Sequence, residues 1–133
     1  MRIATFNVQN MRLRQSKSGV LLSGARDRDG SARQSAAAKA SDVIDRQLTA
    51  QILRKANADV VAMQEVFDRE TLDYFHDRIL LPSGSAPYPF RICLPGNDGR
   101  GYDVALMSRI GLEDVKSHAT LTAKDLGLER EAG

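Results

Sequence analysis

The stretch ADVVAMQEV, residues 58–66, decides the fold, because an almost continuous apolar run there stops at the carboxylate of Glu65. Such a run is typical of a parallel strand that is covered on both faces. The stretch RIATFNVQN, residues 2–10, is predicted to be a second strand, which ends at Asn7. We therefore expect two strands that each end in a polar side chain able to bind a metal ion or its water.

A helix is predicted between these two strands, from about residue 35 to residue 57. Its apolar side chains recur at three- and four-residue spacing, namely Ala37, Ala40, Ile44, Leu48, Ile52 and Ala56. A strand–helix–strand connection is normally a right-handed crossover, which makes the two strands parallel. Asn7 and Glu65 should then emerge at the same edge of the sheet, where open α/β sheets place their ligands.

The sequence after residue 66 predicts a second helix and a hairpin. Asp68 is the expected N-cap of the helix, Leu72, Phe75 and Ile79 form its apolar stripe, and Pro82 ends it. Residues 90–94 and 102–107 are predicted strands, joined by a glycine-rich turn into an antiparallel hairpin. Residues 115–121 are a further candidate strand. The predicted fold class is α/β, with a mixed β-sheet and covering helices in a single domain of residues 1–133.

Charge is distributed unevenly along the 133 residues, although the net charge is only +2. Residues 1–39 hold eight Lys or Arg against two Asp, so this part carries +6 and the remainder −4. Most of these cations lie in a predicted polar loop, residues 9–32, which has no sustained periodicity. An anionic partner and a merely solvated basic loop explain this asymmetry equally well.

The remaining composition bears on the compartment. Cys93 is the single cysteine, so an intrachain disulfide is impossible, and this usage suits a reducing compartment. No apolar stretch is long enough for a signal peptide or a transmembrane segment. We therefore expect a cytoplasmic protein.

The two polar strand ends each have a structural and a functional interpretation. Glu65 is either a capped or salt-bridged rim residue or a ligand of a hard cation such as Mg²⁺, and the spacing alone gives these equal weight. Asn7 either starts a turn or bridges a phosphate oxygen or a metal-bound water. Strand alternation predicts that Gln64 points away from Glu65 and is structural.

Three basic residues are candidates for contact with a phosphate group at the rim of this site. They are Arg12, Arg14 and Arg100. For each of them taken singly, a solvated surface position is the more common role.

Three motifs together resemble the opening motifs of the endonuclease/exonuclease/phosphatase family: TFNVQN at residues 5–10, QEV at 64–66 and GYDVALMSR at 101–109. The resemblance implies a phosphodiesterase or phosphatase that depends on Mg²⁺, or on Mn²⁺ in its place. It also implies a four-layer α/β/β/α sandwich, of which this chain would form about half. By this resemblance Asn7 matches the early active-site Asn, and Glu65 matches the metal-binding Glu.

The later motifs of that family, an Asp-x-Asn loop and a terminal Ser-Asp-His, do not occur in the 133 residues. The two histidines, His76 and His118, are not preceded by Ser-Asp. The chain is thus expected to be the N-terminal portion of such a domain and inactive by itself. Its sheet would expose an apolar face through which copies could associate.

Two functions are therefore carried forward from the sequence. The first is a phosphoesterase acting on a phosphate-ester substrate, with nucleic acid slightly favoured over lipid because the N-terminal segment is basic. The alternative is a non-enzymatic α/β module that binds an anionic partner through the basic loop at residues 9–33. A Mg²⁺ titration and a salt titration separate the two.

Overall fold

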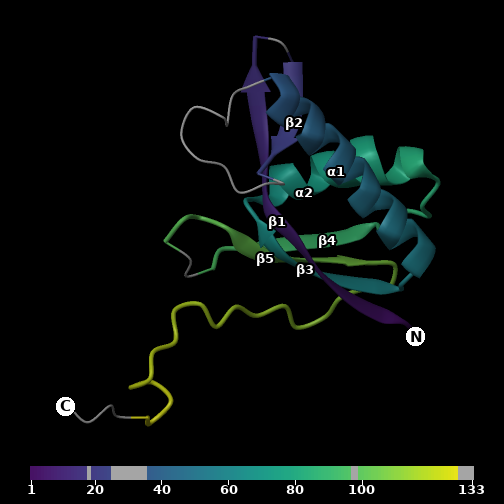
Figure 1. Cartoon of the computed structure of the whole chain (residues 1–133). Helices are drawn as coiled ribbons and strands as arrows, with labels where there is room; N and C mark the ends of the chain where they lie inside the picture. The colour runs from purple at the N-terminus through teal and green to yellow at the C-terminus, as the bar shows by residue number, and fades with distance from the viewer. Residues whose placement is uncertain (18, 25–35, 97–98, 129–133) are drawn as a thin grey trace.

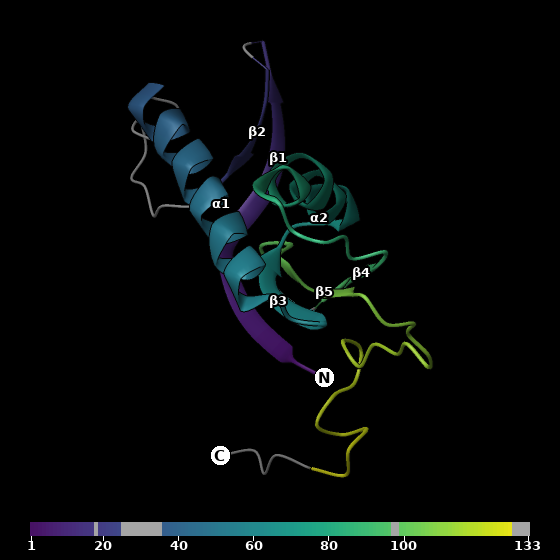
Figure 2. The same cartoon turned by 90° about the vertical axis from the view of Figure 1, so that its right-hand side faces the viewer.

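The computed structural model describes residues 1–17, 19–24, 36–96 and 99–128, which form a mixed five-stranded sheet with two helices on one of its faces (Figure 1, Figure 2). The strand order is β2-β1-β3-β5-β4. The strands are β1 (Ile3–Ser16), β2 (Gly19–Ser23), β3 (Val60–Val66), β4 (Phe90–Leu94) and β5 (Asp103–Ser108), and the helices are α1 (Ala36–Ala56) and α2 (Arg69–Phe75). The predicted α/β class is confirmed.

The centre of the sheet is the parallel pair β1–β3. The register runs from Ile3 opposite Val60 to Asn7 opposite Gln64, so the predicted parallel pairing of the two strands that α1 connects is confirmed. Strand β5 pairs antiparallel with both β3 and β4, which confirms the predicted hairpin. The helix N-cap is also as predicted, because Asp68 Oδ1 accepts a hydrogen bond of 2.8 Å from the backbone N–H of Thr71.

The predicted end of the first strand at Asn7 is wrong, and so is the described part of the loop predicted for residues 9–32. Strand β1 continues to Ser16 and turns back as β2, with Arg12 opposite Ser23 and Ser16 opposite Gly19. Figure 1 shows this hairpin projecting beyond the rest of the sheet. Its β1 arm after Arg12 is mostly polar, and of its side chains only Leu22 belongs to the buried core, so no apolar alternation predicts it. Residues 25–33 of the predicted basic loop lie outside the described residues.

Helix α1 turns a different side to the sheet than its apolar spacing predicts. Ile44, Leu48 and Ile52 are 55%, 49% and 51% exposed. The side chains that the helix buries are instead Asp42, Arg46, Ala50 and Leu53. The orientation follows from Arg46, whose guanidinium group donates hydrogen bonds to backbone carbonyls of β1 and β2. Because those bonds require Arg46 to face the sheet, the apolar stripe faces away.

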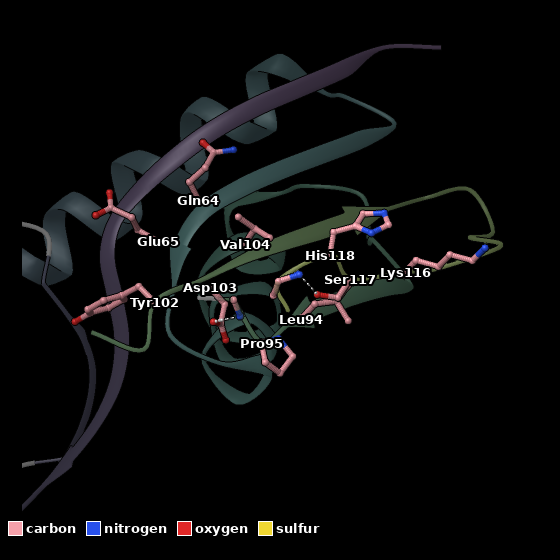
Figure 3. Close-up of a pocket in the computed structure, with 12 residues that line it drawn as sticks. Gln64, Glu65, Leu94, Pro95, Tyr102, Asp103, Val104, Lys116, Ser117 and His118 are labelled. Carbon is pink, nitrogen blue, oxygen red and sulfur yellow. Dashed lines mark hydrogen bonds between the residues drawn. The ribbon is translucent and has the colours of Figure 1, made fainter. Parts of the chain in front are cut away.

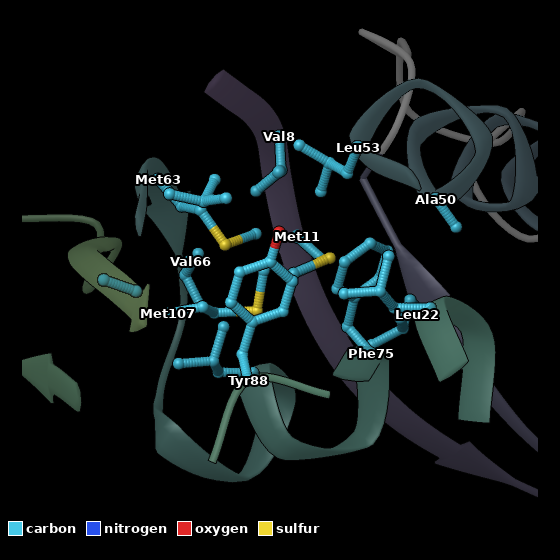
Figure 4. Packing of buried hydrophobic residues seen from close by; sticks show 14 of the residues in the cluster. Val8, Met11, Leu22, Ala50, Leu53, Met63, Val66, Phe75, Tyr88 and Met107 are labelled. Carbon is cyan, nitrogen blue, oxygen red and sulfur yellow. The ribbon is translucent and has the colours of Figure 1, made fainter. Parts of the chain in front are cut away.

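A compact apolar core lies between the sheet and the helices (Figure 4). The largest fully buried side chains in it include Met11, Met63, Phe75 and Tyr88. The hydroxyl group of Tyr88 donates a 2.7 Å hydrogen bond to the carbonyl oxygen of Ala58, which satisfies a buried polar group. After α2 the chain continues as a π-helix at His76–Leu80 and a 3-10 turn at Leu81–Ser83, which contains Pro82.

The opposite face of the sheet carries no helix in the described part of the chain, and we call it the open face. Its side chains alternate with the buried ones, and include Ile3, Thr5, Asn7, Val60, Ala62, Gln64, Ile92, Leu94, Val104 and Leu106. The prediction that β3 is covered on both faces is therefore wrong for the described residues. Helices pack on one side of the sheet, and the other side of β3 is half-buried between its neighbouring strands.

The segment after β5 forms turns and bends, so the candidate strand at residues 115–121 is wrong. Val115 and Leu121 are exposed, and this segment pairs with no strand of the described chain. Figure 1 shows it running past the sheet. None of the helices in the described ranges combines the length and the apolar character needed to cross a membrane.

Candidate functional site

One end of the open face is polar, and the two predicted site residues lie there. Asn7 is opposite Gln64 in the β1–β3 register, one residue before Glu65. The side chain of Gln64 donates a 2.9 Å hydrogen bond from Nε2 to Thr5 Oγ1 across the same two strands. The parallel register thus places Asn7 beside the end of β3 that carries Glu65.

A β-bulge determines where the Glu65 side chain points. Between the pairs Met63–Ala105 and Val66–Asp103, two residues of β3 face one residue of β5. Glu65 itself has a positive φ of 63°, which is uncommon for a residue other than glycine. The bulge interrupts the strand alternation, so that Gln64 and Glu65 line the same pocket (Figure 3). The prediction that Gln64 points to the opposite face from Glu65 is wrong for this reason.

The pocket beside Glu65 has a volume of about 470 Å³. Leu94, Pro95 and Val104 form an apolar part of its wall, and Glu65 and Asp103 supply acidic groups. The segment after β5 contributes Lys116, Ser117, His118 and Ala119, and Figure 3 shows Lys116 and His118 toward the end away from Glu65. Sequence reasoning missed these tail residues, because no motif marks them and they pair with no strand of the described chain.

Glu65 has a weak ionic partner. Its Oε1 lies 3.7 Å from Arg100 Nη2, and the side chains of Glu65 and Arg100 are 26% and 61% exposed. Such an exposed pair contributes little to stability, at most about 1 kcal/mol. A dissolved cation can therefore compete for this carboxylate.

Two of the three predicted phosphate-binding residues lie on an aromatic pair beside Glu65. The guanidinium carbon of Arg12 is 3.9 Å from the ring centre of Phe67, and that of Arg100 is 5.5 Å from the ring centre of Tyr102. The two rings contact each other edge to face, with their centres 5.8 Å apart. Stacking of this kind holds a guanidinium group while leaving its N–H groups able to bind an anion.

Arg14, the third candidate, is placed differently. Its Nε donates a 3.4 Å hydrogen bond to Ser23 Oγ within the β1–β2 hairpin. None of Arg12, Arg14 and Arg100 lines the pocket itself. Arg100 thus lies 3.7 Å from Glu65, Arg12 is linked to it only through the rings of Phe67 and Tyr102, and Arg14 lies on the projecting hairpin.

The orientation of the Asn7 amide is set by the backbone two residues later. Asn7 Oδ1 accepts a 2.8 Å hydrogen bond from the N–H of Gln9, which leaves the Nδ2 group to donate to a ligand. A donor at this position suits a phosphate oxygen or a metal-bound water better than direct metal coordination. That Asn7 is itself a metal ligand stays a prediction.

Several other reactive side chains serve the fold. His76 Nε2 accepts a 3.0 Å hydrogen bond from the backbone N–H of Tyr88, and Asp103 Oδ1 accepts one of 2.7 Å from the N–H of Gly96. Burial raises the pKa of the Cys93 thiol to about 11, and the charges of Asp103 and Asp68 act in the same direction. Cys93 is therefore not a thiolate nucleophile at neutral pH.

The donor set fits a magnesium ion better than a transition metal. Within the described ranges, no three His, Cys, Asp or Glu side chains gather closely enough to hold a metal ion. Mg²⁺ commonly binds proteins through only one or two carboxylates and keeps several of its waters, or takes phosphate oxygens of the substrate. The carboxylate of Glu65 at the pocket and the outward-facing amide of Asn7 match this mode of binding.

The sequence model of the Endonuclease/Exonuclease/phosphatase family matches residues 4–129. No curated protein and no solved structure matches the chain.

Proposed function

The chain belongs to the endonuclease/exonuclease/phosphatase family, and from this we propose that its site is that of a phosphoester hydrolase that depends on Mg²⁺ or Mn²⁺. In this proposal Glu65 holds the ion. The Asn7 amide donates to an ion-bound water or to a phosphate oxygen. The observation that supports the proposal best is the parallel β1–β3 register, which pairs Asn7 with Gln64, the residue before the pocket-lining Glu65.

The bound ion would neutralise phosphate oxygens and polarise the bond that water attacks. The protein groups would bind and orient the ester. Arg12 and Arg100, stacked on Phe67 and Tyr102, are proposed to bind phosphate oxygens beside Glu65. His118 lines the same pocket, but the family's Ser-Asp does not precede it. We therefore expect little or no hydrolysis from these 133 residues by themselves.

A nucleic acid is the substrate class that we favour. The basic side chains Arg12, Arg14 and Lys17 lie on the β1–β2 hairpin, and Arg12 is also one of the two stacked arginines of the site. A polyanion that reaches the pocket would pass this hairpin, whereas a lipid surface would call for exposed aromatic side chains, and aromatic residues make up only 5% of the chain. A cytoplasmic location is also part of the proposal, because the single Cys93 suits a reducing compartment.

The open face is proposed to be an association surface. It carries Ile3 and Val104, both more than half exposed, beside half-buried apolar side chains of β3, β4 and β5. In a four-layer sandwich a second sheet would cover this face. In the isolated chain, another copy is the available partner.

A Mn²⁺ titration, followed by the loss of free-ion EPR signal, tests the metal site. We expect the wild-type chain to bind Mn²⁺ weakly and Mg²⁺ to displace it, whereas Glu65→Gln should lower the affinity at least tenfold. Glu70→Gln, which removes an exposed acid on α2, is the charge-matched control and should bind like the wild type. Equal binding by the wild type and Glu65→Gln would reject Glu65 as the ligand.

The alternative is a non-enzymatic module that binds an anionic partner through the basic segment at residues 9–33, of which the hairpin arginines are the described part. Both functions allow binding to a duplex DNA fragment that weakens steeply with salt. The enzyme interpretation adds a dependence on Mg²⁺ that Glu65→Gln removes. Binding that is salt-dependent and unchanged by Mg²⁺ and by Glu65→Gln would favour the module.

A further inference from the structure

Arg46 is a buried cation on α1. Its side chain donates hydrogen bonds to β1 and β2 close to Asn7. Its side chain is 3% exposed. Its guanidinium group donates to the carbonyl oxygens of Gln9 at 2.9 Å, Ser23 at 2.7 Å and Leu22 at 3.4 Å, and also to that of Val8. One side chain thus holds four carbonyls on two strands.

Two of these carbonyls belong to a bulge in β1. Between the pairs Asn7–Gln64 and Met11–Val66, three residues of β1 face a single residue of β3. Gln9 and Asn10 take positive φ values of 52° and 47°, a conformation that costs free energy in residues other than glycine. Carbonyl groups in a bulge lose their hydrogen-bond partners on the neighbouring strand, and buried carbonyl groups need another hydrogen-bond donor. Arg46 supplies that donor.

The end of β2 closes on the same bulge. Gly24 has a φ of 93°, and a Cβ atom at this position would lie 2.0 Å from the carbonyl oxygen of Asn10. The backbone directly after β2 therefore approaches the bulge so closely that only glycine fits there. Arg46 binds the carbonyls on both sides of this approach, those of Gln9 and Ser23.

We propose that Arg46 is a positioning residue for the site, because it holds the β1 bulge that orients the Asn7 amide. The path is short: Arg46 binds the carbonyl of Gln9, and the N–H of Gln9 binds Asn7 Oδ1. The planar guanidinium group reaches several carbonyls at once, which the single ammonium group of a lysine cannot reproduce. The value of this orientation for catalysis rests on the proposed function, but the orientation itself can be measured without any metal.

NMR spectra of Arg46→Lys test the proposal directly. We expect the Asn7 side-chain NH₂ resonances to move and the Gln9 amide to exchange with solvent at least tenfold faster than in the wild type. The matched control is Arg91→Lys, which alters another largely buried arginine, one that donates to Asp73 and to the Tyr88 carbonyl. This control should leave the Asn7 and Gln9 signals unchanged. Unchanged signals in a folded Arg46→Lys would overturn the proposal.

The reciprocal variant keeps the proposal testable if Arg46→Lys does not fold. Asn7 is exposed, so Asn7→Ala should fold, and the coupling between the two groups must act in both directions. We expect the Arg46 Nε–H to exchange faster with solvent in Asn7→Ala, and the Nε–H of Arg91 to remain as it is. No change at Arg46 would show that it does not act on Asn7.

Metal binding separates this proposal from the function on which it rests. If Arg46→Lys moves the Asn7 signals and also weakens Mn²⁺ binding about fivefold, both stand. If the Asn7 signals move while neither Arg46→Lys nor Glu65→Gln affects Mn²⁺, the positioning role stands and the metal site fails. If Glu65→Gln abolishes Mn²⁺ binding while Arg46→Lys leaves the Asn7 signals in place, the positioning role fails alone.

Discussion

The two faces of the sheet come from the same strands, yet they are specified in different ways. The covered face consists of apolar side chains such as Met63 and Met107, which are fully buried against α1, α2 and Tyr88. The open face begins with apolar side chains and ends at the polar group around Asn7 and Glu65. The comparison teaches that packing against helices defines the first face, whereas bulges and long-range hydrogen bonds place the side chains of the second.

The largest expected effect compares two side chains of β5 that point to opposite faces. Met107→Ala removes a fully buried side chain and should lower the free energy of unfolding by about 2–5 kcal/mol. Val104→Ala removes one that is 60% exposed and should change it by less than about 0.5 kcal/mol. Urea denaturation of both variants gives the comparison. A similar loss in the two would mean that the open face is packed in solution.

The second effect concerns association of the open face. If copies associate through it, the apparent mass in sedimentation velocity should rise with concentration, and Val104→Asp should abolish that rise, because a charge placed in an apolar contact is costly. Leu48 is an exposed apolar side chain of α1, on the other side of the molecule, and Leu48→Asp is therefore the control that should leave the association intact. If only Leu48→Asp changed the apparent mass, the contact between copies would lie on α1 and not on the open face.

The smallest effect concerns the rim of the covered face, where Asp73 accepts hydrogen bonds from Arg69 and Arg91. Partial burial acts to raise the pKa of Asp73, but the bonds from Arg91 and Arg69 prevail and lower it. Since the folded-state pKa is depressed, the contribution to stability is present above the unfolded pKa of about 3.9 and is lost as the pH falls through the folded value.

Asp73→Asn should therefore lower the free energy of unfolding at pH 7 by no more than about 1 kcal/mol, because the carboxylate is about a third exposed. The difference from the wild type should shrink toward zero at pH 3. Urea denaturation at both pH values measures it, and Glu113→Gln, an exposed acid in the tail, serves as the control. A difference that grows on acidification would contradict the assigned direction of the pKa.

The parts of the fold that the sequence predicts are those with local signals. The period of residues 36–56 predicts α1, the apolar run at residues 60–63 predicts β3, and Asp68 marks the start of α2. The continuation of β1 beyond Asn7 has no such signal, because its pairing with β2 and its bulge depend on backbone contacts. The buried side of α1 was predicted wrongly because apolar spacing cannot show that Arg46 is needed at the sheet.

The candidate site could be predicted only in part, for the same physical reason. Asn7 and Glu65 are recognisable because each follows a short apolar run, and the parallel register follows from the crossover. Nothing in the sequence indicates the positive φ of Glu65, so the sequence does not predict that Gln64 and Glu65 line the same pocket. The stacking of Arg12 on Phe67 joins residues 55 positions apart, which no local pattern reports.

The parallel pairing of β1 with β3 also has a consequence for how the molecule folds. The hairpins β1–β2 and β4–β5 close short loops, whereas the paired residues of β1 and β3 are 55 to 57 positions apart in the chain, so that closing this loop carries a larger entropic penalty. The amide and the carboxylate therefore become neighbours late on the folding pathway. A chain in which both hairpins had formed but β1 and β3 were still unpaired would lack the juxtaposition of Asn7 and Glu65.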